Sequence, residues 1–129
     1  MNDIDHNPTP LGELALQTVA MPADTNPSGD IFGGWLVSQM DLAGMITAHK
    51  VANGRVATVA IEGMAFLTPV NVGAVVSCYC EVLEVGRSSV RILVEVWIKS
   101  MYDGALLKVT EGEFVFVAID QNGRTRAIN

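Results

Sequence analysis

Four long runs of β-branched and apolar residues occupy the second half of the chain and constrain its fold more than any other feature. They cover residues 55–66, 75–85, 89–101 and 106–119, and runs of this composition and length predict β-strands. Short segments rich in turn formers separate them, so consecutive strands should run antiparallel. The last run breaks its two-residue alternation between Glu113 and Val115, where we expect a bulge or an interface.

One helix is expected before these strands. Residues 31–52 contain no proline, and their apolar side chains fall on nearly every face of a helix. This distribution is typical of a helix enclosed by other structure. Residues 13–19 add a short candidate strand. The expected fold class is therefore α+β, with a long five-stranded antiparallel sheet wrapped around one central helix, which is the hotdog fold.

A single domain is expected at residues 11–129, because apolar residues are spread evenly along the chain. Residues 1–10 hold two prolines and several polar groups, which predicts a flexible N-terminal tail. Hydrophobic residues make up 50% of the chain and charged residues only 17%, which suggests burial in an oligomer. Because both outer strands would keep open edges, we expect a homodimer with a continuous ten-stranded sheet, or a larger even-numbered assembly.

The charge distribution argues against two classes of partner. The net charge is −6, whereas nucleic-acid binding needs clustered Lys and Arg. All eight basic residues lie at or beyond Lys50, so an anionic ligand should meet the second half of the chain. No window holds the ~18 apolar residues of a membrane span, and the acidic start is unlike a signal peptide. We expect a cytoplasmic protein, with Cys78 and Cys80 as reduced core residues.

Asp41 is the main anomaly of the sequence. It lies in the middle of the apolar helix, between Met40 and Leu42. An unpaired carboxylate there would be costly to desolvate. Either it meets solvent or a partner group at a dimer interface, or it is the acid–base or nucleophilic group of a site that opens onto the helix. We favour the second interpretation.

Gly33 and Gly34 stand at the start of the same helix and form a second candidate. First-turn N–H groups at the positive end of the helix dipole can hold an oxyanion, and glycine lets a ligand approach closely. The alternative is that both glycines only permit a tight turn before the helix. Asp41 lies roughly 12 Å further along the axis. The carboxylate and the amides could therefore act on one carbonyl only if they came from two antiparallel helices of a two-fold dimer.

Asn26, in the turn-rich loop before the helix, is a third candidate. Its amide could orient a water or hold a carbonyl, and the alternative is an Asx-type turn residue. His6 lies in the tail and His49 near the far end of the helix, so one chain can assemble neither a Ser-His-Asp triad nor a three-His zinc site. We expect no metal site.

Residues 21–41 (MPADTNPSGDIFGGWLVSQMD) and 62–70 (EGMAFLTPV) closely resemble the YciA-type acyl-CoA thioesterases, part of the acyl-CoA hydrolase family. The resemblance covers roughly residues 11–128. It implies hydrolysis of acyl-CoA to free acid and CoA, with broad chain-length tolerance and no cofactor, in a hexamer built as a trimer of dimers. Asp41 matches the family's catalytic aspartate, Gly33 and Gly34 the amides that polarise the thioester carbonyl, and Asn26 an asparagine that works opposite the partner subunit's aspartate.

The residues that bind CoA are expected in the sheet half, where the basic residues lie. Thr68, Arg87, Ser88 and Ser89 are the candidates, although residues 86–89 first suggest a hairpin turn. Two other functions remain open. A hotdog dehydratase or hydratase would need a histidine paired with a carboxylate, and a non-catalytic acyl-CoA-binding or regulatory module would keep the pocket without turnover.

Overall fold

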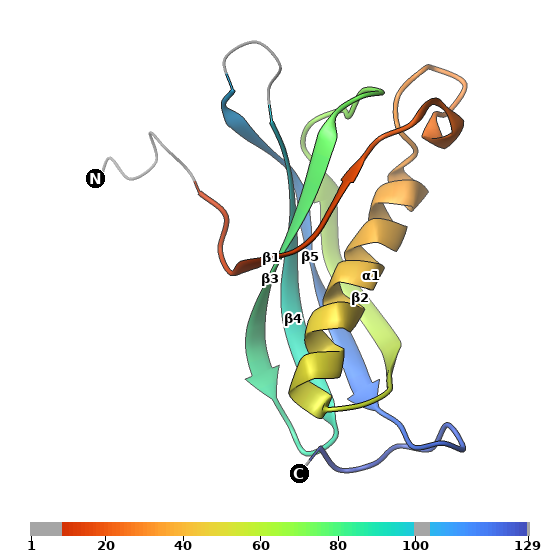
Figure 1. Ribbon diagram of the computed structural model, residues 1–129, viewed down its shortest axis with the longest axis vertical. Helices are drawn as coiled ribbons and strands as arrows, with labels where there is room; N and C mark the ends of the chain where they lie inside the picture. The colour runs from red at the N-terminus through yellow and green to blue at the C-terminus, as the bar shows by residue number, and fades with distance from the viewer. Residues whose placement is uncertain (1–8, 100–103, 129) are drawn as a thin grey trace.

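One long helix and five strands make up the regular structure of the described residues, 9–99 and 104–128, in the computed structural model (Figure 1). The predicted tail at residues 1–10 falls mostly outside them. The elements are β1 (Glu13–Val19), a short 3-10 turn (Pro22–Asp24), α1 (Gly33–Ala52), β2 (Val56–Phe66), β3 (Val75–Val85), β4 (Ser89–Lys99) and β5 (Leu106–Ala118).

The five strands form one antiparallel sheet in the order β1-β3-β4-β5-β2. The sheet curves around α1, which lies across its concave face (Figure 1). The hotdog prediction is confirmed, and β1 and β2 are the two edge strands. Among the described residues, no helix has the length and apolar character needed to cross a membrane.

Gly44 sets how closely α1 rests on the sheet. A Cβ atom at this position would lie 2.8 Å from a ring carbon of Phe116 and 3.5 Å from Val94. Phe116 is fully buried and stacked against Phe114, so its ring has little room to move. The helix can therefore pack at this distance because residue 44 has no side chain.

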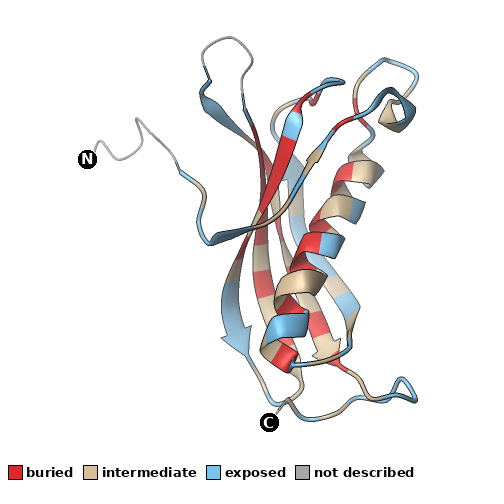
Figure 2. Cartoon of the chain, viewed as in Figure 1, coloured by how far each residue is buried: buried red, intermediate tan, exposed pale blue. Residues whose placement is uncertain are grey.

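Only part of the helix surface is covered in the single chain. Leu36, Met40 and Ala43 face the sheet and are buried, whereas Leu42 is 46% exposed. Figure 2 shows buried and exposed residues alternating along α1. The prediction of a fully enclosed helix is therefore met on one side only, because five strands cannot wrap all the way around it.

The expected bulge between Glu113 and Val115 is absent from the pairing of β5 with β4. That pairing is regular from Val117 to Glu111 and shifts near Val109. Glu113 and Val115 both alternate with the buried Phe114, so they share the outer face, where polar and apolar side chains are mixed. The pairing of β2 with β5 has two further irregularities, one between Thr58 and Ala60 and one between Glu62 and Ala65.

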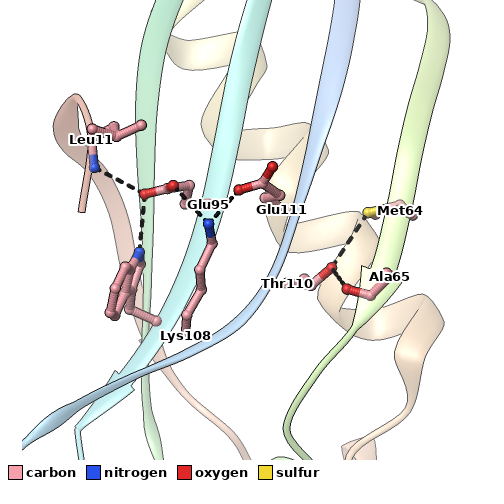
Figure 3. A network of polar contacts seen from close by, with 8 residues as sticks. Leu11, Met64, Ala65, Glu95, Lys108, Thr110 and Glu111 are labelled. Atoms are coloured by element: carbon pink, nitrogen blue, oxygen red, sulfur yellow. Dashed lines mark hydrogen bonds and ion pairs between the residues drawn. The ribbon is translucent and has the colours of Figure 1, made fainter. Parts of the chain in front are cut away.

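A buried carboxylate on the outer face joins β4, β5 and the N-terminal segment (Figure 3). Glu95 is 2% exposed and accepts hydrogen bonds from the Leu11 N–H at 2.9 Å and from Trp97 Nε1 at 3.1 Å. Its other oxygen pairs with Lys108 Nζ at 3.0 Å, and Lys108 also pairs with Glu111. Partial burial alone would lower the pKa of Lys108, but the hydrogen bonds to Glu111 and Glu95 raise it overall. The charge is thus fully partnered, as buried charges must be.

Cys78 and Cys80 are buried and unpaired with each other, as expected. Burial, with a smaller contribution from the neighbouring thiol of Cys80, raises the pKa of Cys78 to about 12. Both thiols therefore stay protonated and unreactive near neutral pH.

We predict that Gly44→Ala destabilises the protein. The added methyl group overlaps the Phe116 ring, and overpacking of this kind typically costs about 1–3 kcal/mol. Better helix propensity returns less than about 1 kcal/mol. Thermal unfolding should show a midpoint several degrees below that of the wild type, and an unchanged midpoint would mean that the helix does not depend on this close approach.

Candidate active site

The Asp41 carboxylate points toward edge strand β2. Its Oδ1 accepts a hydrogen bond of 2.6 Å from Thr58 Oγ1. Asp41 is half-buried and Thr58 is exposed in the single chain, so the pair lies at the open border between α1 and β2. The hydroxyl donor holds the carboxylate in one orientation there.

Sequence reasoning missed Thr58. It lies in an ordinary β-strand run 17 residues after Asp41, and no local pattern distinguishes it from the other small residues of β2. Only the packing of β2 beside α1 shows that the hydroxyl meets the carboxylate.

Gly33 and Gly34 begin α1, and their N–H groups have no backbone acceptor within the described part of the chain. Neither glycine has a positive φ. A Cβ atom at Gly34 would meet nothing within 4 Å, and one at Gly33 would touch only the Phe66 ring, at 3.5 Å. The chain's own backbone therefore does not require glycine at either position, which disfavours the tight-turn alternative. Gly34 is exposed and Gly33 half-buried in the single chain, so a ligand can approach this end of the helix.

Asn26 adopts the Asx turn that was the alternative to a site role. Its Oδ1 accepts hydrogen bonds from the N–H groups of Ser28 at 2.9 Å and Asp30 at 3.1 Å. The side-chain NH₂ group remains a donor. The loop that carries it is tied to its surroundings by Ile31 N–H, which bonds Val70 O at 2.9 Å. A role in binding the substrate stays a prediction.

One chain cannot bring the carboxylate and the free amides onto a single carbonyl. The helix is continuous from Gly33 to Ala52, so the separation of roughly 12 Å between Gly33 and Asp41 holds. Two hollows of about 400 and 220 Å³ both lie elsewhere, one beside β1 and the end of α1 and the other beside Glu62 and Glu113. Among the described residues, no cluster of three or more His, Cys, Asp or Glu side chains could hold a metal.

The four CoA candidates do not form one cluster in a single chain. Thr68 lies in the loop that follows β2, at the same end as Gly33, and its Oγ1 donates to Lys108 O at 3.0 Å. The other three candidates lie in the β3–β4 hairpin at the opposite end (Figure 1). An 11-residue strand such as β3 spans roughly 36 Å. These residues could contact one ligand only if they came from different subunits.

Large hydrophobic side chains on and beside α1 and β2 stay exposed in the single chain, and we call this group the β2 face. It consists of large hydrophobic side chains that are 43–65% exposed: Phe32, Leu42, Val59, Ile61, Phe66 and Leu67. Exposed apolar groups gathered along an unpaired strand edge mark an interaction surface. The site thus lies at a border that a second molecule can cover.

Comparisons with known proteins give consistent findings. The family model described as the thioesterase superfamily matches residues 28–105. The acyl-CoA thioester hydrolase YciA of Escherichia coli K12 is 53% identical over 126 residues, which cover 95% of this chain and 95% of that protein.

Two solved structures are similar over nearly the whole chain. A hexameric broad-specificity acyl-coenzyme A thioesterase is 53% identical, with a TM-score of 0.91 and coverage of 96% of this chain and 86% of that one. A hexameric thioesterase of Yersinia pestis is 52% identical, with a TM-score of 0.89 and coverage of 94% and 98%.

We predict that Gly34→Ala leaves the fold intact and does not lower its stability. The methyl group enters open space, and alanine favours a helix over glycine by about 0.5–1 kcal/mol. The melting temperature should be equal to or above that of the wild type. Gly44→Ala, the same change in the same helix, is the matched control and should shift the melting temperature downward. A comparable loss in both variants would show that Gly34 is needed for packing.

Proposed function

The chain belongs to the thioesterase superfamily and, within it, to the YciA-type acyl-CoA thioester hydrolases, and we propose that Asp41 is its catalytic carboxylate in a site shared by two subunits. Its reaction is the hydrolysis of acyl-CoA to a free carboxylic acid and CoA. The observation that carries the assignment of the site is the Asp41–Thr58 pair at the open border of α1 and β2. The carboxylate is held in place at an uncovered apolar edge, where a second subunit can complete the active site.

Two contacts between α1 and β2 support the shared site. Asp41 contacts Thr58, and Gly33 lies beside Phe66. Each pair of positions is eight residues apart along its own element, 33 to 41 on α1 and 58 to 66 on β2. If two β2 strands pair antiparallel about a two-fold axis near Glu62, Thr58 of one subunit lies opposite Phe66 of the other. The same rotation brings each carboxylate to the partner's free amides.

The proposed chemistry needs only groups that this chain supplies. The N–H groups of Gly33 and Gly34 would bind the thioester carbonyl oxygen and stabilise the negative charge that develops on it. Asp41 of the other subunit would then take a proton from the attacking water, or attack the carbonyl carbon itself. The C–S bond breaks, and the CoA thiolate leaves and is protonated. Attack by water gives the free acid directly, whereas attack by Asp41 gives a mixed anhydride that a water molecule then hydrolyses. Because a thiolate is a good leaving group, neither a metal nor a cofactor is needed.

The two-fold arrangement also brings Thr68 of one subunit to the same end of the dimer as the β3–β4 hairpin of the other. Antiparallel pairing of β2 with its copy places the β3–β4 hairpin of one subunit at the end where the other subunit has Gly33 and Thr68. Arg87 in that hairpin is exposed and could meet a phosphate group. We propose that CoA extends from the free amides toward the partner's hairpin.

We further propose that the dimers assemble into hexamers and that the enzyme accepts a range of acyl chains. Structures at 52–53% identity are hexameric, and one of them has broad specificity. Two unpaired buried thiols are compatible with the reducing cytoplasm, which remains the expected location.

The two rival functions differ in testable ways. A dehydratase needs a histidine at the carboxylate, but His49 is exposed and eight residues beyond Asp41 on α1, roughly 12 Å along the axis. A non-catalytic acyl-CoA-binding module would bind substrate without releasing free thiol. An assay for thiol release from several acyl-CoAs separates both from hydrolysis.

We predict that Asp41→Asn lowers kcat by about 10²–10⁴-fold, the usual contribution of general-base help. Asparagine keeps the shape and can still accept the Thr58 hydrogen bond, so the fold should be unchanged by melting temperature. Thiol release from butyryl-CoA measures the effect. Glu84→Gln, a similar change at an exposed carboxylate of β3, is the control and should retain full activity. An Asp41→Asn enzyme as active as the wild type would rule out the assignment.

Subunit mixing tests the shared site directly. Asp41→Asn and Gly34→Val chains are each expected to be nearly inactive. In a mixed dimer, one of the two sites combines an intact carboxylate with intact amides. Random refolding makes half of the dimers mixed, so about a quarter of the wild-type activity should return. If each site belonged to one chain, mixing would restore nothing.

A further inference from the structure

Phe66 lies beside Gly33, the first residue of α1. Its ring carbons lie 3.5, 3.7 and 3.9 Å from where a Cβ atom of Gly33 would be. The ring is nevertheless 50% exposed in the single chain. A large aromatic surface thus lies beside the start of α1, and its own subunit covers only about half of it.

The backbone holds this ring in position. Thr110 Oγ1 donates to Ala65 O at 2.6 Å, and the Leu67 N–H bonds Val109 O at 2.7 Å, so both neighbours of Phe66 are tied to β5. Phe66 itself pairs with the fully buried Thr110 and therefore faces the concave side, toward α1. The backbone at Phe66 is therefore held on both sides, and a residue placed in this way can shape a binding site.

The shared site places Phe66 between its two halves. In the two-fold arrangement, the ring lies beside the amides of its own subunit and opposite Thr58 and Asp41 of the other subunit. A carbonyl oxygen bound about 2.7–3.1 Å from the Gly33 N–H lies next to the residue that the Phe66 ring contacts. Of the carbonyl carbon's two substituents, the apolar acyl chain gains by burial against the exposed Phe66 ring, whereas the charged CoA does not.

We propose that Phe66 is a specificity-determining residue that forms the wall of the acyl site at the first carbons of the chain, and that it excludes acyl groups branched at Cα. This inference rests on the proposed function. A flat ring in van der Waals contact with a straight chain leaves no room for an extra methyl group on its side. Discrimination of one methyl group by such a wall is worth about 10–200-fold in kcat/KM.

The test is the ratio of kcat/KM for isobutyryl-CoA to that for butyryl-CoA. In Phe66→Ala this ratio should rise at least about tenfold above the wild-type ratio, because the methyl branch gains space while the straight chain loses contact. Phe66→Leu should give a smaller rise and keeps the test available if the alanine variant does not fold. Leu67→Ala is the matched control. It removes the next, more exposed side chain (65%), and the ratio should stay at the wild-type value.

Two results would overturn the inference. An unchanged ratio in Phe66→Ala, with kcat/KM reduced equally for both substrates, would show a merely structural role. An equal rise in Leu67→Ala would assign the effect to the loop as a whole.

Titration calorimetry can compare the binding of the isobutyryl and butyryl groups without turnover. The ligands are ketone analogues of the two substrates, in which CH₂ replaces the thioester sulfur. If the wild type released no CoA from either substrate, the proposed function would fail, while the ratio of the two analogue Kd values would still decide the role of Phe66.

Discussion

The single helix α1 and the curved five-stranded sheet cover each other only in part, and the exposed border between α1 and β2 follows from this incomplete packing. Gly44 lets α1 settle closely on β4 and β5, so the helix is firmly buried along one stripe. Its flank toward β2 stays open, with Leu42, Val59 and Ile61 exposed. Leaving this much apolar surface along an unpaired strand edge is unfavourable in water. We therefore expect a second molecule along β2, and the carboxylate proposed to act in catalysis lies at that border.

Two carboxylates differ in the same way, one buried with partners inside the chain and one at the open border. On the outer face, Glu95 is completely buried and uses both oxygens for partners within the chain. At the β2 border, Asp41 has the Thr58 hydroxyl as its hydrogen-bond donor and keeps access to whatever covers the border. A fully partnered carboxylate stabilises the fold, whereas one with a free side can take part in chemistry. The difference in surroundings separates the structural role of Glu95 from the role proposed for Asp41.

The proposed site depends on two contacts between α1 and β2, one at each end of the shared border. The helix positions 33 and 41 and the strand positions 58 and 66 differ by the same number of residues, although a strand rises about twice as much per residue as a helix. Two irregularities shorten the path of β2, because its eight residue steps from Thr58 to Phe66 pair with only six of β5, from Phe116 to Thr110. In a two-fold dimer, the carboxylate of each chain would meet the amides of the other, so the dimer would have two complete sites. The carbonyl, the donors and the carboxylate can meet without any long loop to carry them.

Much of the secondary structure and several candidate site residues could be predicted from the sequence alone. The composition of the runs located all five strands and the helix within two residues of their observed bounds, because side-chain periodicity is a local property. Asp41 and the Gly33–Gly34 pair were candidates from the sequence, and helix geometry alone predicts that they could act on one carbonyl only if they came from two chains. The tertiary structure decided what depends on neighbours distant in sequence: the strand order, the open flank, the Thr58 partner of Asp41, the ring of Phe66 beside Gly33, and the separation of Thr68 from the β3–β4 hairpin. These relations are set by how β2 lies beside α1, and no local pattern of residues encodes which elements become neighbours.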